Sequence, residues 1–202
     1  MSENQPTSGV WDDETAASET DEQLMSAFAR GSTDAFHELF RRYRQPVFGF
    51  FCRRLVDRGT AEELAQETFI ALLKAQQRYE ATALFRTYLY AVAYGILRAH
   101  RRKTAFRAFF SGSAEGREPV AESGVEAGIA LREAVGKLDR VDREIVLLRE
   151  FEELSYVEIA AVLRLPVNTV RSRLFRARRA LRELLAAPVV KTTELKNAEE
   201  HA

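Results

Sequence analysis

The sequence predicts an all-α protein of two small helical domains joined by a flexible linker, the C-terminal one a helix-turn-helix. Apolar residues recur at helical spacing in two long stretches, 21–103 and about 125–187. Between them, 108–128 is rich in Gly, Ser, Pro and Glu, a composition typical of a linker. We divide the chain into a disordered acidic tail (1–20), a helical domain (21–105), a linker (106–126), a second helical domain (127–187) and a flexible tail (188–202).

The first domain begins with two expected helices. Leu24 and Phe28 mark a short helix that Gly31 ends, and a longer helix follows over 33–55. Pro46 falls inside the longer helix and leaves a kink or a break open. The apolar positions of this helix are Phe36, Leu39, Phe40, Tyr43, Val47, Phe48, Phe51 and Leu55.

Two further helices complete the first domain. The third is expected to open with a capping box formed by Thr60 and Glu63, and to run to about Gln77. The fourth is expected over 87–103, and its end is basic. The second domain then starts with two helices, whose apolar stripes are Leu131, Val135 and Leu138 in one and Ile145, Leu148 and Phe151 in the other.

The segment 154–181, LSYVEIAAVLRLPVNTVRSRLFRARRAL, has the pattern of a helix-turn-helix. Ser155 can cap a helix that runs through Leu163, Arg164 and Leu165 form the turn, and Pro166 suits the first position of the next helix. That helix has an apolar stripe of Val170, Leu174, Ala177 and Leu181, and its opposite face carries Arg171, Ser172, Arg176 and Arg179.

Charge bias favours DNA as the partner of this last helix. Residues 164–185 hold seven arginines and one acid, Glu183. A merely solvated helix usually mixes its charges, and a helix lying on a membrane would have a broader and bulkier apolar face. Both alternatives stay open, but an arginine-rich second helix is typical of major-groove binding.

The 202-residue chain has zero net charge, but its acidic and basic residues are concentrated in different segments. Residues 1–22 carry seven acids and no Lys or Arg, whereas 98–107 carry five Lys or Arg and no acid. Because a partner responds to the local field, two basic islands are compatible with nucleic-acid binding. The 46% hydrophobic content is enough for packed cores.

Several classes of protein are disfavoured by composition. The single cysteine, Cys52, excludes an internal disulfide and a cysteine-based zinc site, and is expected to fill a core. The three histidines and the carboxylates show no ligand or catalytic spacing, so we expect no metal, no cofactor, no catalytic residues and no enzyme activity. The polar N-terminus and the lack of a long apolar run predict a cytoplasmic protein without a membrane contact.

Three motifs in order resemble the extracytoplasmic-function (ECF) subfamily of bacterial RNA polymerase sigma factors. They are AEELAQETFIALLKA at 61–75, FRTYLYAVAYGILRAHRRK at 85–103 and the segment 154–181. The resemblance covers about 21–185 and implies a protein that binds core RNA polymerase, through its clamp helices and flap, and directs promoter recognition, DNA opening and transcription initiation.

The first motif implies the polymerase contact. An acidic face would speed docking to a basic partner, although a solvated face is the alternative reading. Thr60 stands where the family usually has an acid, and a phosphorylatable Thr there leaves a kinase as a possible partner beside an ordinary N-cap role. The implied polymerase-binding residues are Glu62, Glu63, Gln66, Glu67 and Thr60.

The second motif implies recognition and opening of the proximal promoter element. Basic side chains can hold phosphates, and aromatic faces can stack on an unpaired base, at roughly 1–3 kcal/mol per base. Phe85 and Tyr90 are expected to be core residues instead. The family usually has Asn at the position of Gly95 and Asp at that of Ala99. The implied DNA-binding residues are Tyr79, Arg86, Tyr88, Arg98, Arg101, Arg102 and Lys103.

The third motif implies recognition of the distal promoter element. Arg171, Ser172, Phe175 and Arg176 match the reading face, while Arg149, Tyr156 and Glu158 are expected to contact the sugar-phosphate backbone or to orient arginines. The full implied set is Arg149, Tyr156, Glu158, Thr169, Arg171, Ser172, Phe175, Arg176 and Arg179.

An alternative function is a stand-alone helix-turn-helix regulator that binds operator DNA as a dimer. Such a protein needs a dimerisation or ligand-binding domain, and the acidic and basic faces of 21–103 fit polymerase docking and DNA melting better. A nucleic-acid hydrolase would need metal-binding carboxylate clusters, for which the sequence shows no spacing. Family members are often held by an anti-sigma protein, so such a partner is a further expectation.

Overall fold

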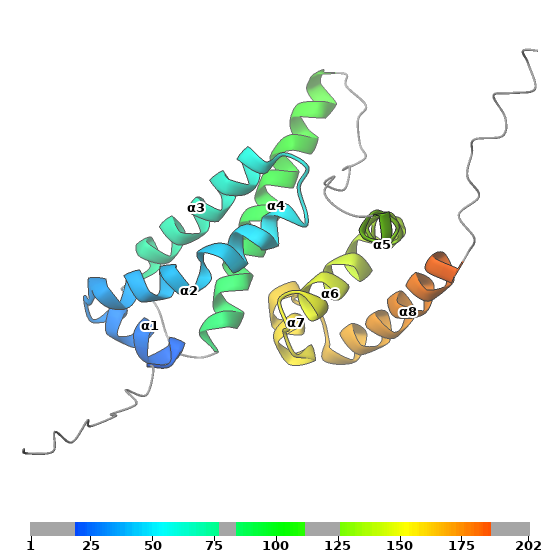
Figure 1. Cartoon of the computed structure of the whole chain (residues 1–202). Helices are drawn as coiled ribbons and strands as arrows, with labels where there is room; N and C mark the ends of the chain where they lie inside the picture. The colour runs from blue at the N-terminus through cyan, green and yellow to red at the C-terminus, as the bar shows by residue number, and fades with distance from the viewer. Residues whose placement is uncertain (1–18, 77–83, 112–125, 187–202) are drawn as a thin grey trace, which may run out of the picture.

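The computed structural model describes residues 19–76, 84–111 and 126–186, and all of the regular structure in these ranges is helical (Figure 1). The expected all-α class is confirmed. The helices are α1 (Asp21–Ala29), α2 (Thr33–Cys52), α3 (Arg58–Ala75), α4 (Phe85–Ser111), α5 (Glu126–Lys137), α6 (Arg140–Glu150), α7 (Tyr156–Leu163) and α8 (Val167–Ala186).

The first unit consists of α1 to α4. The helix α2 packs against α1 and α3, and α3 packs against α4 (Figure 1). Phe50, Phe51 and Phe85 are fully buried where these helices meet. Aromatic side chains of this size supply much of the apolar area that holds a small helical domain together.

The helix α2 continues through Pro46, so the proline does not interrupt it. Proline removes one backbone hydrogen bond and is costly inside a helix. Pro46 lies on the exposed face of α2, where water can satisfy the carbonyl group that loses its partner. The buried face, with Val47 and Phe50, holds the helix against its neighbours.

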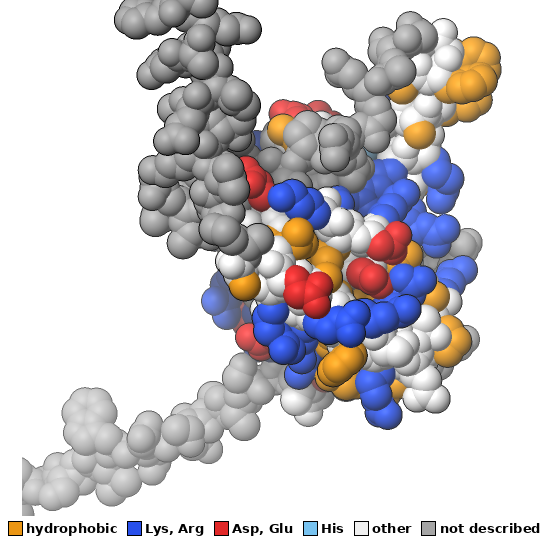
Figure 2. Space-filling model, turned by 90° about the vertical axis from the view of Figure 1, so that its right-hand side faces the viewer, with side chains coloured by type: hydrophobic (Ala, Val, Ile, Leu, Met, Phe, Trp, Pro, Cys, Tyr) orange, Lys and Arg blue, Asp and Glu red, His pale blue; other side chains and the backbone are white. Residues whose placement is uncertain are grey.

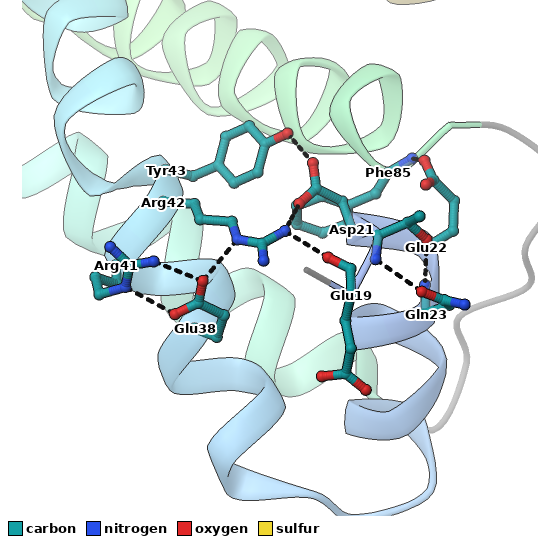
Figure 3. Close-up of polar contacts among 10 residues, drawn as sticks. Glu19, Asp21, Glu22, Gln23, Glu38, Arg41, Arg42, Tyr43 and Phe85 are labelled. Carbon is teal, nitrogen blue, oxygen red and sulfur yellow. Dashed lines mark hydrogen bonds and ion pairs between the residues drawn. The ribbon is translucent and has the colours of Figure 1, made fainter. Parts of the chain in front are cut away.

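A polar network fastens α1 to α2 and α4 (Figure 3). Asp21 accepts hydrogen bonds from Arg42, at 2.8 Å, and from the hydroxyl of Tyr43. Glu22 accepts the backbone N–H of Phe85 at 3.1 Å, which satisfies a donor at the start of α4. Hydrogen bonds from Arg41 and Arg42 lower the pKa of Glu38 to about 2.

The start of α3 differs from the expected capping box. The N-cap is Asp57, whose carboxylate accepts the backbone N–H of Gly59 and of Thr60. Thr60 lies inside the first turn, and its hydroxyl donates to the same carboxylate at 2.6 Å. Asp and Thr are both good caps, so spacing alone did not distinguish them.

The second unit consists of α5 to α8, and α8 packs against α5, α6 and α7 (Figure 1). Ser155 caps the start of α7 as expected, and Glu158 completes a capping box with it. Arg164 ends α7 in the left-handed conformation, with φ 56°. Pro166 lies one residue before α8, and its carbonyl accepts the N–H groups of Thr169 and Val170.

Three expected core residues are exposed instead. Leu131, Phe40 and Phe151 are 44%, 41% and 53% exposed. Ala134 takes the buried position on α5. Phe151 lies just after α6, where its ring is covered on one side by the guanidinium group of Arg53. The helix α4 also runs to Ser111, eight residues beyond its expected end.

The two units contact each other through α4 and α7. The side chains of Arg54 and Arg101 from the first unit pair with acids of the second unit in this contact. Within 19–76, 84–111 and 126–186, every helix is too short or too polar to cross a lipid bilayer.

Candidate nucleic-acid interface

The outer face of α8 presents most of the residues expected to read the distal element. Its inner stripe is buried, with Val170, Leu174 and Ala177 at most 2% exposed. Figure 2 shows Lys and Arg side chains gathered over the side of the molecule on which α8 lies. The exposed members of the expected set are Arg171, Ser172, Phe175, Arg176 and Arg179.

The arginines of α8 fall into two groups. Arg173 pairs with Asp142 at 2.8 Å and Arg178 with Glu150 at 2.6 Å, so both fasten α8 to α6. The hydrogen bond with Asp142 raises the pKa of Arg173. In the part of the chain that the structure describes, Arg171 and Arg176 form no ion pair. These two side chains have their donors available for a base edge or a phosphate.

Two residues expected at the DNA backbone have structural contacts. Arg149 donates to the carbonyl of Leu154 at 3.0 Å, and its guanidinium group lies over the ring of Tyr156. These contacts hold the loop before α7. Thr169 is half-buried at the start of α8, where its carbonyl accepts the hydroxyl of Ser172.

Glu158 does not face solvent. It is 8% exposed, completes the capping box with Ser155, and accepts hydrogen bonds from Arg86 and Thr87 of α4. Burial acts to raise the pKa of Glu158, but the hydrogen bonds from Ser155, Thr87 and Arg86 outweigh it and lower the pKa. The carboxylate of Glu158 therefore binds side chains of the first unit.

The residues expected at the proximal element are divided along α4. Arg98, Arg102 and Lys103 are exposed. Arg101 is buried and donates to Glu144 at 2.9 Å, while Arg86 is bound to Glu158. Two expectations of burial are confirmed, since Phe85 and Tyr90 are 0% and 3% exposed, whereas Tyr88 is half-buried and Tyr79 lies outside the described residues.

The acidic face of α3 is where the motif places it. Glu62, Glu63, Gln66 and Glu67 are exposed, whereas Thr60 is half-buried with its hydroxyl bound to Asp57. Ile70 and Leu73, which sequence reasoning did not assign to this face, are 47% and 45% exposed on the next turn. The available signal was that Ile70 lies three residues after Glu67 and Leu73 three residues after Ile70.

The end of α4 carries another feature that sequence reasoning missed. Phe106, Phe109 and Phe110 are 65%, 81% and 70% exposed, and Phe110 contacts the other two rings. The linker expected over 106–126 includes all three of these residues. Although Phe109 and Phe110 lie close to Gly112 in sequence, α4 continues through both of them to Ser111.

The side chains of the candidate site suit binding to nucleic acid and to protein. No group of three or more His, Cys, Asp or Glu side chains that could hold a metal is found among the described residues. Exposed guanidinium groups on α8 and α4 suit phosphates and guanine edges, and the carboxylates of α3 suit a basic protein surface.

Comparison with known families matches both units. The family model for Sigma-70 region 2 matches residues 39–107, and that for Sigma-70 region 4 matches residues 128–181. The first match contains α3 and most of α4, and the second contains the helix-turn-helix.

Curated relatives match over most of their length. The RNA polymerase sigma-H factor of Pseudomonas aeruginosa is 34% identical over 184 residues, covering 83% of this chain and 94% of that protein. The ECF RNA polymerase sigma-E factor of Escherichia coli strain K12 is 30% identical over 188 residues, covering 80% and 92%.

Solved structures share the fold. CnrH, in complex with the cytosolic domain of CnrY, is 26% identical with a TM-score of 0.64 and covers 84% of this chain and 99% of that one. The sigma factor RpoE of Bartonella quintana, in complex with the anti-sigma factor NepR, has a TM-score of 0.65, at 23% identity, over 77% and 99%. The two family models, the curated relatives and the paired helical units together show that the chain belongs to the ECF subfamily of RNA polymerase sigma factors.

Proposed function

We propose that this chain binds core RNA polymerase, recognises two promoter elements and promotes DNA opening at a specific set of genes. In this proposal α8 reads the distal element, α4 binds the proximal element and α3 docks on the polymerase. The chain carries out no chemical step of its own and acts in the cytoplasm, where polymerase and DNA are found.

One observation carries the proposal: α8 follows a capped helix and a tight turn, and its exposed face presents arginines that form no ion pair with any described residue. Arg171 and Arg176 lie five residues apart in sequence, about 1.4 turns of α8, with Ser172 and Phe175 between them. Arginine can donate two hydrogen bonds to guanine, and such contacts supply about 1–3 kcal/mol of discrimination. The buried stripe holds this face rigidly.

The polymerase contact is supported by α3. Its acidic residues are followed on the next turn by exposed Ile70 and Leu73. A docking surface commonly combines apolar anchors with charges that steer the partner. Relatives named as sigma factors match this region of the chain, which agrees with the assignment.

A protein partner that controls the chain is also proposed. CnrH was solved in complex with the cytosolic domain of CnrY, and that neighbour covers most of this chain. The hydroxyl of Thr60 is bound to Asp57, so a kinase acting there would first have to break this contact. Control by protein binding therefore has the better structural support.

The test is transcription from fragmented genomic DNA with core polymerase, in the presence and absence of the chain. We expect new transcripts whose 5′ ends map downstream of two shared sequence motifs at a fixed spacing. The chain alone should bind the same fragments weakly. Tight duplex binding as a dimer, with no new transcripts, would instead identify an operator-binding regulator.

A further inference from the structure

The last turns of α4 carry three exposed phenylalanines, which we call the phenylalanine cluster. Phe106, Phe109 and Phe110 are 65%, 81% and 70% exposed. The ring centroids of Phe106 and Phe110 lie 4.6 Å apart, and those of Phe109 and Phe110 lie 5.4 Å apart. Figure 1 shows the end of α4 projecting past α2 and α3, so the rings are presented to solvent on a free helix end.

The helix that carries the cluster is strongly basic. α4 contains six Arg or Lys residues and no Asp or Glu. Arg102, Lys103 and Arg107 are exposed in the turns that lead to the rings. Figure 2 shows a hydrophobic group at the top of the molecule, above a band of Lys and Arg side chains. Such a surface suits a partner that offers both flat apolar faces and negative charge.

The phenylalanine cluster differs in composition from the exposed apolar group of α3. On α3 the exposed apolar side chains are the aliphatic Ile70 and Leu73, and they lie beside acids. On α4 every exposed large apolar side chain is aromatic, and these rings lie beside cations. Aliphatic side chains serve well in protein contacts, but only aromatic rings offer planar faces on which bases stack. The composition therefore favours nucleic acid as the partner of this end of α4.

The cluster also continues the expected proximal DNA surface. Lys103 precedes Phe106 by three residues, and Phe106 precedes Phe110 by four, so these side chains share one face of α4. A helix rises about 1.5 Å per residue, which places Lys103 within about 10 Å of Phe110 along the axis. Among the described residues, Arg102 and Lys103 form no ion pair, and both are available to phosphates.

The family match does not extend over the whole cluster. The region 2 match ends at residue 107, and the region 4 match begins at residue 128. Phe109 and Phe110 lie between the two matched regions. The family model therefore does not account for these two rings, and their role has to be inferred from this chain's own structure.

We propose that the phenylalanine cluster, together with Arg102, Lys103 and Arg107, binds an unpaired stretch of DNA. The rings stack on the bases, and the cations hold the neighbouring phosphates. Because paired bases are stacked on one another already, a duplex contacts only the cations. At a promoter the opened strand next to the proximal element supplies this ligand, and that consequence rests on the proposed function. The binding site itself is a property of the chain alone.

The first test compares full-length variants by fluorescence anisotropy, without polymerase. The probes are a labelled thymidine strand of about 12 nucleotides and a duplex of the same length. Phe106→Leu, Phe109→Leu and Phe110→Leu are combined, which keeps the apolar bulk and removes the planar rings. The triple variant should bind the single strand about tenfold or more weakly, because stacking on one base contributes about that factor. Its binding to the duplex should equal that of the parent.

The matched control is Phe40→Leu. Phe40 is 41% exposed on α2, where its ring contacts Phe36 and Phe69, and its replacement should leave both affinities unchanged. Unchanged single-strand binding in the triple variant overturns the proposal, and so does an equal loss on single strand and duplex. If single-strand binding is unchanged but core polymerase is bound more weakly, the cluster is a protein contact instead.

Salt dependence separates the two parts of the site. Arg102→Gln with Lys103→Gln removes two phosphate contacts and should lower the slope of log affinity against log salt by about 1.4, at about 0.7 per phosphate of a single strand. The triple phenylalanine variant should keep the slope of the parent. A lowered slope in that variant would mean that the rings act only by positioning the cations, which overturns stacking.

Cross-linking locates the bound strand in the parent chain and needs no variant. The thymidine strand carries 5-iodouracil at several positions, and ultraviolet light bonds this base to an aromatic ring stacked on it. Trypsin cuts after Arg107 and Arg117, so a base bonded to Phe109 or Phe110 is found on peptide 108–117. Mass spectrometry should identify that peptide, whereas cross-links confined to other peptides contradict the site.

The proposed function is tested separately from this site. If the parent chain fails to direct transcription with core polymerase but the triple variant loses single-strand binding, the proposed function alone is wrong. If the parent directs transcription and the triple variant keeps single-strand binding, the site alone is wrong. The two failures are therefore distinguishable.

Discussion

Arginine serves opposite purposes on α8 and on α4. On α8, Arg171 and Arg176 are exposed and have no acid within pairing distance among the described residues. On α4, Arg101 is buried against Glu144, and Arg86 is half-buried against Glu158. The difference teaches that a basic motif defines a surface only where its side chains face solvent, and that exposure depends on the other unit.

The largest expected effect comes from removing a buried side chain that supports the exposed face of α8. Leu174→Ala should lower the free energy of unfolding by about 2–5 kcal/mol, because it leaves a cavity beneath α8. Phe175→Ala, on the neighbouring exposed position, should change it by less than about 0.5 kcal/mol. Urea unfolding followed by circular dichroism measures both, and equal losses would mean that α8 is not packed as described.

The next largest effect is expected from Arg176→Ala, which should change promoter specificity and leave stability unaltered. If Arg176 pairs with a base edge, its loss should cost about 1–3 kcal/mol and flatten preference at one or two promoter positions. Arg179→Ala should weaken binding alike on all sequences and lower the salt slope by about one unit. The measurement is transcription from a library of distal-element variants at two salt concentrations.

Arg178→Ala is the matched control for that experiment, because its guanidinium group is paired with Glu150 within the unit. It should leave the rank order of promoters unchanged. If Arg176→Ala also keeps the rank order of the parent chain, the reading face has been assigned wrongly.

The acidic face of α3 gives a smaller expected effect. Glu63→Lys with Glu67→Lys should weaken binding to core polymerase by about tenfold, through lost attraction and new repulsion. Helicity should be retained, because both side chains are exposed. A pull-down titration checks this, with Glu183→Lys at an exposed position of α8 as the control. Unchanged affinity would remove α3 from the docking surface.

The smallest expected effect concerns the start of α3. Asp57→Ala should lower Tm more than Thr60→Ala, because only Asp57 accepts backbone N–H groups there. Hydrogen bonds from Thr60 lower the pKa of Asp57, so this contribution is present above the ordinary carboxyl pKa and is lost as the pH falls through the lowered value. Thermal scans at pH 7 and pH 3 should differ less for Asp57→Ala than for the parent.

Sequence periodicity was sufficient for most of the helices and for the division of α8 into a buried and an exposed face. The stripe of Val170, Leu174 and Ala177 is buried as predicted, because the spacing of apolar residues along a helix dictates which face packs. The cap at Ser155 was likewise predicted, because a serine directly before an apolar helical pattern is a local signal. Local rules therefore predicted local structure.

The departures have a common cause in contacts between distant segments. Phe151 was expected in a core, but it lies beyond the end of α6 and contacts Arg53 of the other unit. Arg101 was expected on DNA, yet it pairs with Glu144, which is 43 residues away. Neither partner follows from helical spacing, so such pairings are known only once the two units are placed.

Glu144 is shared by Arg54 and Arg101, and this sharing has a consequence for how these positions evolve. Because Glu144 pairs with Arg54 and Arg101 together, replacing it alone leaves Arg54 with only Glu152 and takes the acid away from buried Arg101, and replacing either arginine alone leaves Glu144 with one cation in place of two. Substitutions at these three positions should therefore be inherited jointly. In lineages where the acid has been lost, we expect the arginines to have drifted as well, which gives genomics a marker for chains whose units move independently.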